Sequence, residues 1–266
     1  ETAYTLVALP LFILMGQLMN ESRITARLID YCLIFVGKIR GGLGLVNVIS
    51  SMLFGGISGS SVSDTASIGS ILIPEMKKRG YPENYAAGLT VASSTMGMVI
   101  PPSIPMVLYA VTAQESVGRL FLGGVFPGII VGLLQLCITI WISSKNSYPR
   151  EEGSVSIKKI LTMTAKNSYI LFMPFFVVGS VILGIATATE SAALGVFYAL
   201  IIGVFFIKSL KLKRICRALK SSVLTSAKIM IIIAFSKIFI WVLAYERIPD
   251  QLSESISTLG LNPTSM

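Results

Sequence analysis

The residues with the clearest chemical potential form a serine-rich run that ends in a carboxylate, Ser58-Gly-Ser-Ser-Val-Ser-Asp-Thr65. Its hydroxyl, carbonyl and carboxylate oxygens are hard ligands of the kind that sodium takes, and a helix that ends here would free further carbonyls. The N–H groups that start the next helix could bind an anion. The alternative is close packing of small residues. A carboxylate in so apolar a sequence favours a functional role. The candidate residues are Ser58, Gly59, Ser60, Ser63 and Asp64.

A second run, Ser93-Ser-Thr-Met-Gly-Met-Val-Ile-Pro-Pro-Ser103, lies inside an apolar segment. Two consecutive prolines remove backbone donors and clash with the preceding turn, so the helix must break here. The carbonyls that the break frees could coordinate a cation. A simple kink is the alternative, but three prolines, one glycine and several hydroxyls exceed what a kink requires. The candidate residues are Ser94, Thr95, Gly97, Ile100, Pro101, Pro102 and Ser103. Sodium ligands are expected from Ser58, Ser60, Thr95 and Gly97.

A third segment, Gly184–Ala193, reads as a tight connection between two apolar spans. Glu190 is expected to cap the helix that follows. A position near a substrate path, for Thr189 together with Glu190, is the alternative reading.

The elements that carry these segments are predicted to be membrane helices. Hydrophobic residues make up 53% of the 266 residues and charged residues only 13%, which leaves too little charge for the surface of a soluble domain. A helix needs about 20 mostly apolar residues to cross a bilayer. The predicted spans are Tyr85–Ala110, Leu120–Ile142, Tyr169–Ile185, Ala192–Ile207 and Val223–Ala244. The fold class is therefore an all-α polytopic membrane protein, and no cofactor is expected.

The basic residues predict the orientation of these spans, because short cytoplasmic loops are rich in Lys and Arg. The connectors Glu75–Glu83, Ser143–Asn167 and Ser209–Ser221 are basic and read as cytoplasmic, whereas Thr112–Gly118 and Ala186–Thr189 read as external. The net charge of +9 is thus explained by loops beside apolar spans and not by a nucleic-acid site.

The segment at residues 43–74 does not fit a single crossing, because basic residues flank it on both sides. Its Gly- and Ser-rich middle is a poor helix. Two short helices with a polar tip, a re-entrant hairpin, explain both features. Irregular backbone at membrane depth is tolerated only where protein buries it or where it lines a wet cavity. The amphipathic segment Arg23–Lys38 is expected to be an arm on the membrane surface, and an ordinary transmembrane helix is the alternative for the hairpin.

These motifs resemble a known family. Phe54–Ala66, Ile73–Tyr81, Gly97–Ser103 and Gly184–Gly195 together look like the large membrane subunit, the DctM-like permease, of the tripartite ATP-independent periplasmic (TRAP) transporters. The resemblance runs along the whole chain. Ser63-Asp64 stands where Ala-Asp is common in that family, and Ser191 stands where alanine is usual.

The resemblance implies an architecture of two inverted repeats, each with a hairpin and a broken helix, and an elevator-like movement as in ion transporters. Residues 1–142 would be most of the first repeat, with the hairpin at 43–74, the broken helix at 85–110 and a span at 120–142. Residues 143–167 would be a cytoplasmic connector and 168–266 the first part of the second repeat. The second hairpin would follow Met266, so the chain reads as a fragment.

The resemblance also implies a function and partners. Members import organic acids, of the C4-dicarboxylate or sialic-acid type, across the bacterial inner membrane with a sodium gradient. A periplasmic binding protein delivers the substrate, and a small membrane subunit completes the complex. If the sites of the family lie at the matching positions here, the tip at Ser58–Asp64 and the break at Ser94–Ser103 would form one sodium site and half of the substrate site.

Three other readings compete with this one. A binding-protein-independent, ion-coupled anion transporter is the nearest, and protons could replace sodium. A channel is the second, which the paired prolines and the hairpin disfavour. A membrane enzyme is the third, disfavoured because the chain has no histidine and few acids in its apolar segments.

Overall fold

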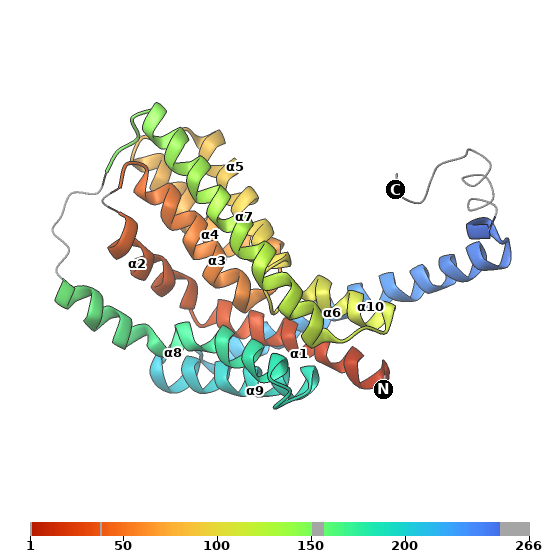
Figure 1. The fold of residues 1–266 in the computed structure, drawn as a ribbon. Coiled ribbons are helices and arrows are strands. Elements are labelled where there is room, and N and C mark those ends of the chain that lie inside the picture. The colour runs from red at the N-terminus through yellow and green to blue at the C-terminus, as the bar shows by residue number, and fades with distance from the viewer. Residues whose placement is uncertain (1, 38, 151–156, 251–266) are drawn as a thin grey trace. The chain divides into compact units, whose positions relative to one another are not determined.

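The computed structural model describes residues 2–37, 39–150 and 157–250, and every regular element in those ranges is helical (Figure 1). The chain divides into two compact units, residues 1–222 and 223–266. Within the described ranges, three helices are long and apolar enough to cross a membrane. They are α7 (Val117–Lys145), α9 (Ala188–Ile201) with the π-helical end Ile202–Phe206, and α10 (Leu212–Tyr245). The prediction of an all-helical, multi-pass membrane protein is confirmed.

The predicted hairpin is present as α3 (Gly42–Ser58) and α4 (Ser61–Lys78), which only Gly59 and Ser60 separate. Gly59 has a φ of +64°, a left-handed conformation that glycine adopts without a steric penalty. Its N–H donates to the Gly55 carbonyl at 3.0 Å and so closes the end of α3. Ser60 then caps α4, because its hydroxyl accepts from the Ser63 N–H at 3.4 Å. Two residues therefore suffice to reverse the chain.

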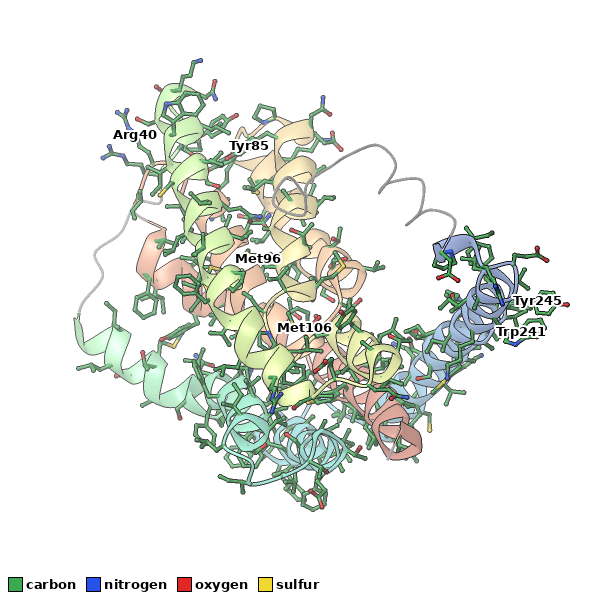
Figure 2. The ribbon with its side chains drawn as sticks, turned by 45° about the vertical axis from the view of Figure 1, so that its right-hand side comes forward. Arg40, Tyr85, Met96, Met106, Trp241 and Tyr245 are labelled. Carbon is green, nitrogen blue, oxygen red and sulfur yellow. The ribbon has the colours of Figure 1, made fainter. Side chains whose placement is uncertain are left out.

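The predicted helix break is also present. α5 (Glu83–Ser94) tightens into a 3₁₀ turn, Thr95–Met98, and the chain is irregular until α6 (Ile104–Ala113) begins. Ser103 bridges the gap, since its hydroxyl donates to the Met98 carbonyl at 2.6 Å and accepts from the Met106 N–H at 3.5 Å. Met96, at the break, lies between Tyr85 on α5 and Met106 on α6 (Figure 2). The same serine thus ends one half-helix and starts the other.

A chain of buried polar side chains holds α3 against α5. Ser51 and Ser93 share a hydrogen bond of 2.9 Å, and the Ser93 hydroxyl donates to the Asn47 side-chain oxygen at 3.0 Å. The Asn47 amide nitrogen donates to the Thr90 hydroxyl at 2.7 Å. All four side chains are buried. Because polar groups in a low-dielectric interior are costly when unpaired, this network favours one register of the two helices.

Four further helices flank the hairpin and the broken helix: α1 (Thr2–Glu21), α2 (Ile24–Val36), α8 (Ile157–Ile182) and α9. α1 packs along α9 and also contacts α3 and α6, whereas α2 packs on α3 and α8. One side-chain bond joins α1 to the hairpin, from the Ser67 hydroxyl to the Asn20 side-chain oxygen at 2.6 Å. α1 therefore touches both the hairpin group and the helices that follow α7.

Two predicted connectors are partly helical. α8 begins at Ile157, ten residues before the predicted connector 143–167 ends, and α7 continues to Lys145. α10 begins at Leu212, so most of the predicted connector Ser209–Ser221 is helix. The physical reason is that Lys, Arg, Leu and Ala are good helix formers. Hydropathy therefore marks where a membrane boundary lies and not where a helix ends.

The chain that leaves α7 packs back on the base of the hairpin. The ring of Tyr148 lies 4.7 Å from that of Tyr81 and 5.1 Å from that of Tyr85. The Gly41 N–H donates to the Pro149 carbonyl at 3.3 Å. Burial raises the pKa of Tyr81 to about 12, so this phenol stays neutral at physiological pH. The ring contacts and the hydrogen bond from Gly41 fix the end of α7 to the end of the hairpin opposite its tip.

The network between α3 and α5 yields a stability prediction. Asn47→Ala removes the buried hydrogen bonds to Thr90 and Ser93, together with a longer one to the Met76 sulfur. We expect the free energy of unfolding to fall by about 1–3 kcal/mol. Thermal unfolding of the purified full-length protein in detergent measures the change. Asn84→Ala, at an exposed position on α5, is the matched control. Equal melting temperatures for the two variants would show that the network does not stabilise the fold.

Candidate functional site

The hairpin tip and the helix break meet at one point. The Ile104 N–H, the first of α6, donates to the carbonyl of Gly59 at 3.1 Å. A side chain at Gly59 would place its Cβ 2.8 Å from the Pro102 carbonyl oxygen, so the two backbones touch with no side chain between them. Two segments far apart in the sequence therefore interrupt their helices at the same place.

Two other glycines allow this close approach. A Cβ on Gly55 of α3 would lie 2.8 Å from the Gly97 Cα, and one on Gly16 of α1 would lie 2.9 Å from the Ser58 carbonyl oxygen. Small residues at such crossings let helix backbones pack directly in membrane proteins. The tip is thus enclosed by the break on one side and by α1 on another.

Asp64 is the only acidic side chain buried within the described residues, and it lies at this crossing. One carboxylate oxygen is hydrogen-bonded to the Ser58 hydroxyl. The other oxygen is buried and has no hydrogen-bond partner. It faces the backbone of Gly97, where any added Cβ would collide with it. A buried carboxylate oxygen without a partner is costly. Its position is the one in which a bound cation or water would complete the coordination.

Four helix ends converge around Asp64. α3 ends at Ser58 and the 3₁₀ turn ends at Met98, whereas α4 begins at Ser61 and α6 begins at Ile104. Helix C-termini carry partial negative charge and unpaired carbonyls, and N-termini carry partial positive charge and unpaired N–H groups. The crossing therefore offers partial negative charge to a cation and partial positive charge to an anion within a small volume.

The structure brings together most of the predicted sodium ligands but not all. The Ser58 hydroxyl lies 3.4 Å from the Ser60 carbonyl oxygen, and a Cβ on Gly97 would lie 3.4 Å from the Ser60 carbonyl carbon. Thr95 differs, because its exposed hydroxyl donates to the Ala92 carbonyl at 2.7 Å. Among the described residues no group of three His, Cys, Asp or Glu side chains could hold a metal ion. A cation at this crossing would take hydroxyl and carbonyl oxygens together with Asp64.

Several other predicted residues serve the local backbone. Ser60 and Ser103 are helix caps, and the Ser63 N–H is the donor to Ser60. Ser94 donates to the Thr90 carbonyl at 2.7 Å and so points along its own helix. Ile100 and Pro101 lie on the opposite side of the break, where they line an apolar pocket.

Thr189 and Glu190 are not part of this crossing. Glu190 forms the expected cap, because its carboxylate accepts from the Thr187 N–H at 2.8 Å and its own N–H donates to the Thr187 hydroxyl at 3.3 Å. Both residues line a separate pocket of about 670 Å³ with Glu115 and the start of α7. No residue of the tip or the break lines that pocket.

Sequence analysis missed the stripe on α3 that faces the break. Asn47, Ser51 and Gly55 recur at every fourth residue, which places them on one helix face. That spacing of small and polar residues in an apolar helix was the available signal. Gly16 on α1 gave no comparable signal, since its contact with Ser58 is a tertiary one.

Comparison with known proteins shows which family the sequence matches. The family model of the DctM component of the tripartite ATP-independent periplasmic transporters matches residues 2–266. The chain is 36% identical over 260 residues to the C4-dicarboxylate TRAP transporter large permease protein DctM of Pseudomonas aeruginosa. It is 35% identical over 263 residues to a putative TRAP transporter large permease protein of Haemophilus influenzae. It is 34% identical over 264 residues to the sialic acid TRAP transporter large permease protein SiaM of Vibrio cholerae. Each match covers 98% of this chain and 61% of the relative.

The contact between Gly55 and Gly97 yields a second prediction. Gly55→Ala places a methyl group 2.8 Å from backbone that no side-chain rotation can move, so the tip and the break must separate. We expect a lower melting temperature for the purified full-length protein. Gly88→Ala on α5 is the control, because its Cβ meets nothing within 4 Å. Alanine should there be neutral or stabilise the helix by up to about 1 kcal/mol. The predicted contact is absent from the protein if both variants melt alike.

Proposed function

Because the chain belongs to the family of the DctM component of tripartite ATP-independent periplasmic transporters, and is thus part of a transporter permease and not of an enzyme, we propose that the whole protein imports a small organic anion together with sodium. A periplasmic binding protein delivers the anion, and a small membrane subunit completes the complex in the bacterial inner membrane. The chain spans 61% of the length of the relatives named above, so this activity is proposed for the whole protein.

The observation that carries the proposal is Asp64 at the crossing of the tip and the break. Its partnerless oxygen, the Ser58 hydroxyl and the carbonyl ends of α3 and of the 3₁₀ turn are hard oxygen ligands. Sodium takes such ligands, and interrupted helices supply them in secondary transporters. A cation here would also neutralise a carboxylate that the fold otherwise buries without a full set of partners.

The substrate class follows from the other helix ends. The N-termini of α4 and α6 meet at Gly59 and Ile104 and present partial positive charge. Such ends bind carboxylates. The Pseudomonas aeruginosa relative is named for C4-dicarboxylates and the Vibrio cholerae relative for sialic acid, which both carry a carboxylate. We therefore assign carboxylate-bearing organic acids as the substrate class.

The transport step is proposed to be an elevator movement. Backbone contacts at Gly55 and Gly59 fix α3 and α4 to the broken helix, and Tyr148 and Pro149 fix the end of α7 to the hairpin base. These elements would move as one group. α1, α8 and α9 would form the scaffold. In the inverted-repeat arrangement, residues 1–142 would be most of the first repeat, and 168–266 would begin the second.

Uptake by the complete transporter tests the site. We expect Asp64→Asn to reduce sodium-driven uptake about tenfold or more, the factor that about 1.4 kcal/mol of lost binding gives. The full-length permease, its small subunit and its binding protein loaded with radiolabelled C4-dicarboxylate or sialic acid are reconstituted in liposomes with an inward sodium gradient. Glu75→Gln is the control, since Glu75 lies on α4 but pairs with Arg79 at 3.0 Å far from the tip.

The outcomes separate the parts of the proposal. Uptake that requires both sodium and the binding protein, and that Asp64→Asn abolishes, supports all of it. Uptake without the binding protein would indicate a simpler ion-coupled anion transporter. Uptake that follows a proton gradient and ignores sodium would remove the assigned cation. Full uptake by Asp64→Asn would remove the assigned site.

A further inference from the structure

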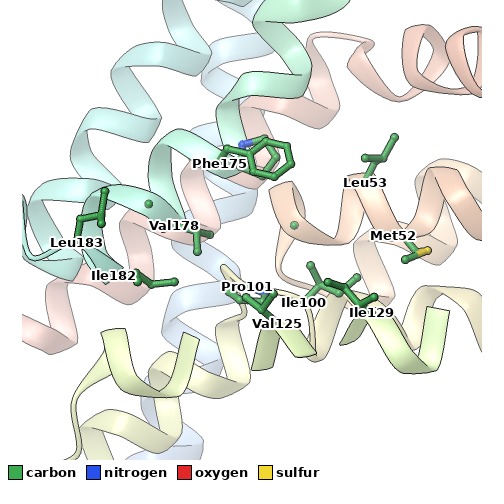
Figure 3. A pocket seen from close by; sticks show the side chains of 13 residues that line it. Met52, Leu53, Ile100, Pro101, Val125, Ile129, Phe175, Val178, Ile182 and Leu183 are labelled. Carbon is green, nitrogen blue, oxygen red and sulfur yellow. The ribbon is translucent and has the colours of Figure 1, made fainter. Parts of the chain in front are cut away.

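A second cavity lies on the far side of the helix break from Asp64. It has a volume of about 590 Å³ and is bounded by α3, by the break, by α7 and by α8 (Figure 3). Its walls include Leu53 from α3, Ile100 from the break, Ile129 from α7, and Val178 and Ile182 from α8. Every side chain that lines it is apolar. Neither sodium nor an organic anion would find a ligand there, so this cavity is not part of the proposed transport site.

The cavity is continuous with a surface that a bilayer would cover. Two of its lining residues, Phe175 on α8 and Leu183 just after the end of α8, are 72% and 73% exposed. On α7, which is long and apolar enough to cross a membrane, Leu122, Phe126 and Leu133 are also exposed. This face is therefore apolar, as a surface that meets hydrocarbon is, and the cavity is a recess in it.

Size and polarity decide the occupant. Water is excluded, because a cavity holds water only where it has polar partners. A helix about 10 Å across with a 5.4 Å pitch occupies roughly 400 Å³ per turn, so the cavity has no room for a crossing helix. A flexible hydrocarbon chain needs no directional partner and fits a volume that lies within the usual range for ligand pockets, roughly 300–1,000 Å³. We propose that this cavity binds a single acyl chain of a membrane lipid.

The bound chain would touch the irregular backbone itself. Pro101 lines the cavity, and its carbonyl oxygen lies 3.3 Å from the position of a Cβ on Gly56. That same Cβ position lies 3.5 Å from Pro174 of α8, so α3, the break and α8 come together at the cavity floor. An acyl chain there fills the space between the break and α8 that side chains leave open.

One substitution adds a side chain to the cavity at a position where its Cβ meets no other atom. Gly179 of α8 lines the cavity, and a Cβ built on it meets no atom within 4 Å. Gly179→Leu therefore places an isobutyl group in the space assigned to the lipid. Gly123→Leu on α7 is the matched control, because Gly123 is also open and exposed but lies outside the lining. Both variants add the same side chain to a glycine in a helix.

The test is photo-crosslinking in liposomes that contain a phosphatidylethanolamine with a diazirine at mid-chain, with the full-length protein and peptide mapping by mass spectrometry. We expect lipid adducts on the cavity residues Leu53, Val178 and Ile182. These adducts should be lost in Gly179→Leu and kept in Gly123→Leu. Both variants are checked for an unchanged melting temperature.

Three results would overturn the proposal, two from lipid labelling and one from a crosslink within the protein. The first is that the unsubstituted protein is labelled at the outward residues Leu122 and Phe126 and carries no adduct at the cavity residues. This result does not depend on whether a variant folds. The second is cavity labelling that Gly179→Leu leaves unchanged. If a photoreactive amino acid at Val178 links to another segment of the same protein and not to lipid, a protein segment is the occupant and the lipid assignment is wrong. None of these readouts depends on transport.

Discussion

Backbone polar groups exposed by a break in a helix have no water to bind inside a membrane. This constraint explains how the hairpin α3–α4 and the broken helix α5–α6 are arranged. The tip between α3 and α4 and the break between the 3₁₀ turn and α6 satisfy one another, through the bond from Ile104 to Gly59 and through the caps Ser60 and Ser103. Glycine is required where the backbones touch, and the crossing leaves space for one buried carboxylate oxygen without a protein partner. The proposed site is thereby a by-product of making two interruptions compatible.

Local chemistry explains what the sequence could predict. Gly59 and the Pro101–Pro102 pair determine their own conformations, so the hairpin and the break were predicted close to their observed positions. The directions of the hydroxyls were not predictable in the same way. Thr95 bonds to its own helix, as serine and threonine often do inside helices, so the local backbone sets the direction of its hydroxyl. The crossing of Gly59 with Pro102, and of Gly55 with Gly97, depends on contacts between distant segments that periodicity does not encode.

The break has two chemically different sides. Gly97 faces the carboxylate of Asp64, whereas Ile100, three residues later, lines a cavity of hydrocarbon character. A few residues of irregular chain thus separate the buried carboxyl group of Asp64 from lipid-like surroundings. Low dielectric on one side strengthens the electrostatic interactions on the other. The apolar side would therefore affect the proposed ion site even though it contributes no ligand.

The stripe of Asn47, Ser51 and Gly55 on α3 has a consequence for how such proteins can diverge. Successive residues in an α-helix are rotated by about 100° around its axis. One residue inserted between Asn47 and Gly55 would turn the tip by that angle away from the break while Asn47 still bonded to Thr90. Substitutions at many α3 positions leave this geometry intact, but a single insertion or deletion does not. The length of this half-helix should therefore be invariant among functional relatives, even where its side chains are not.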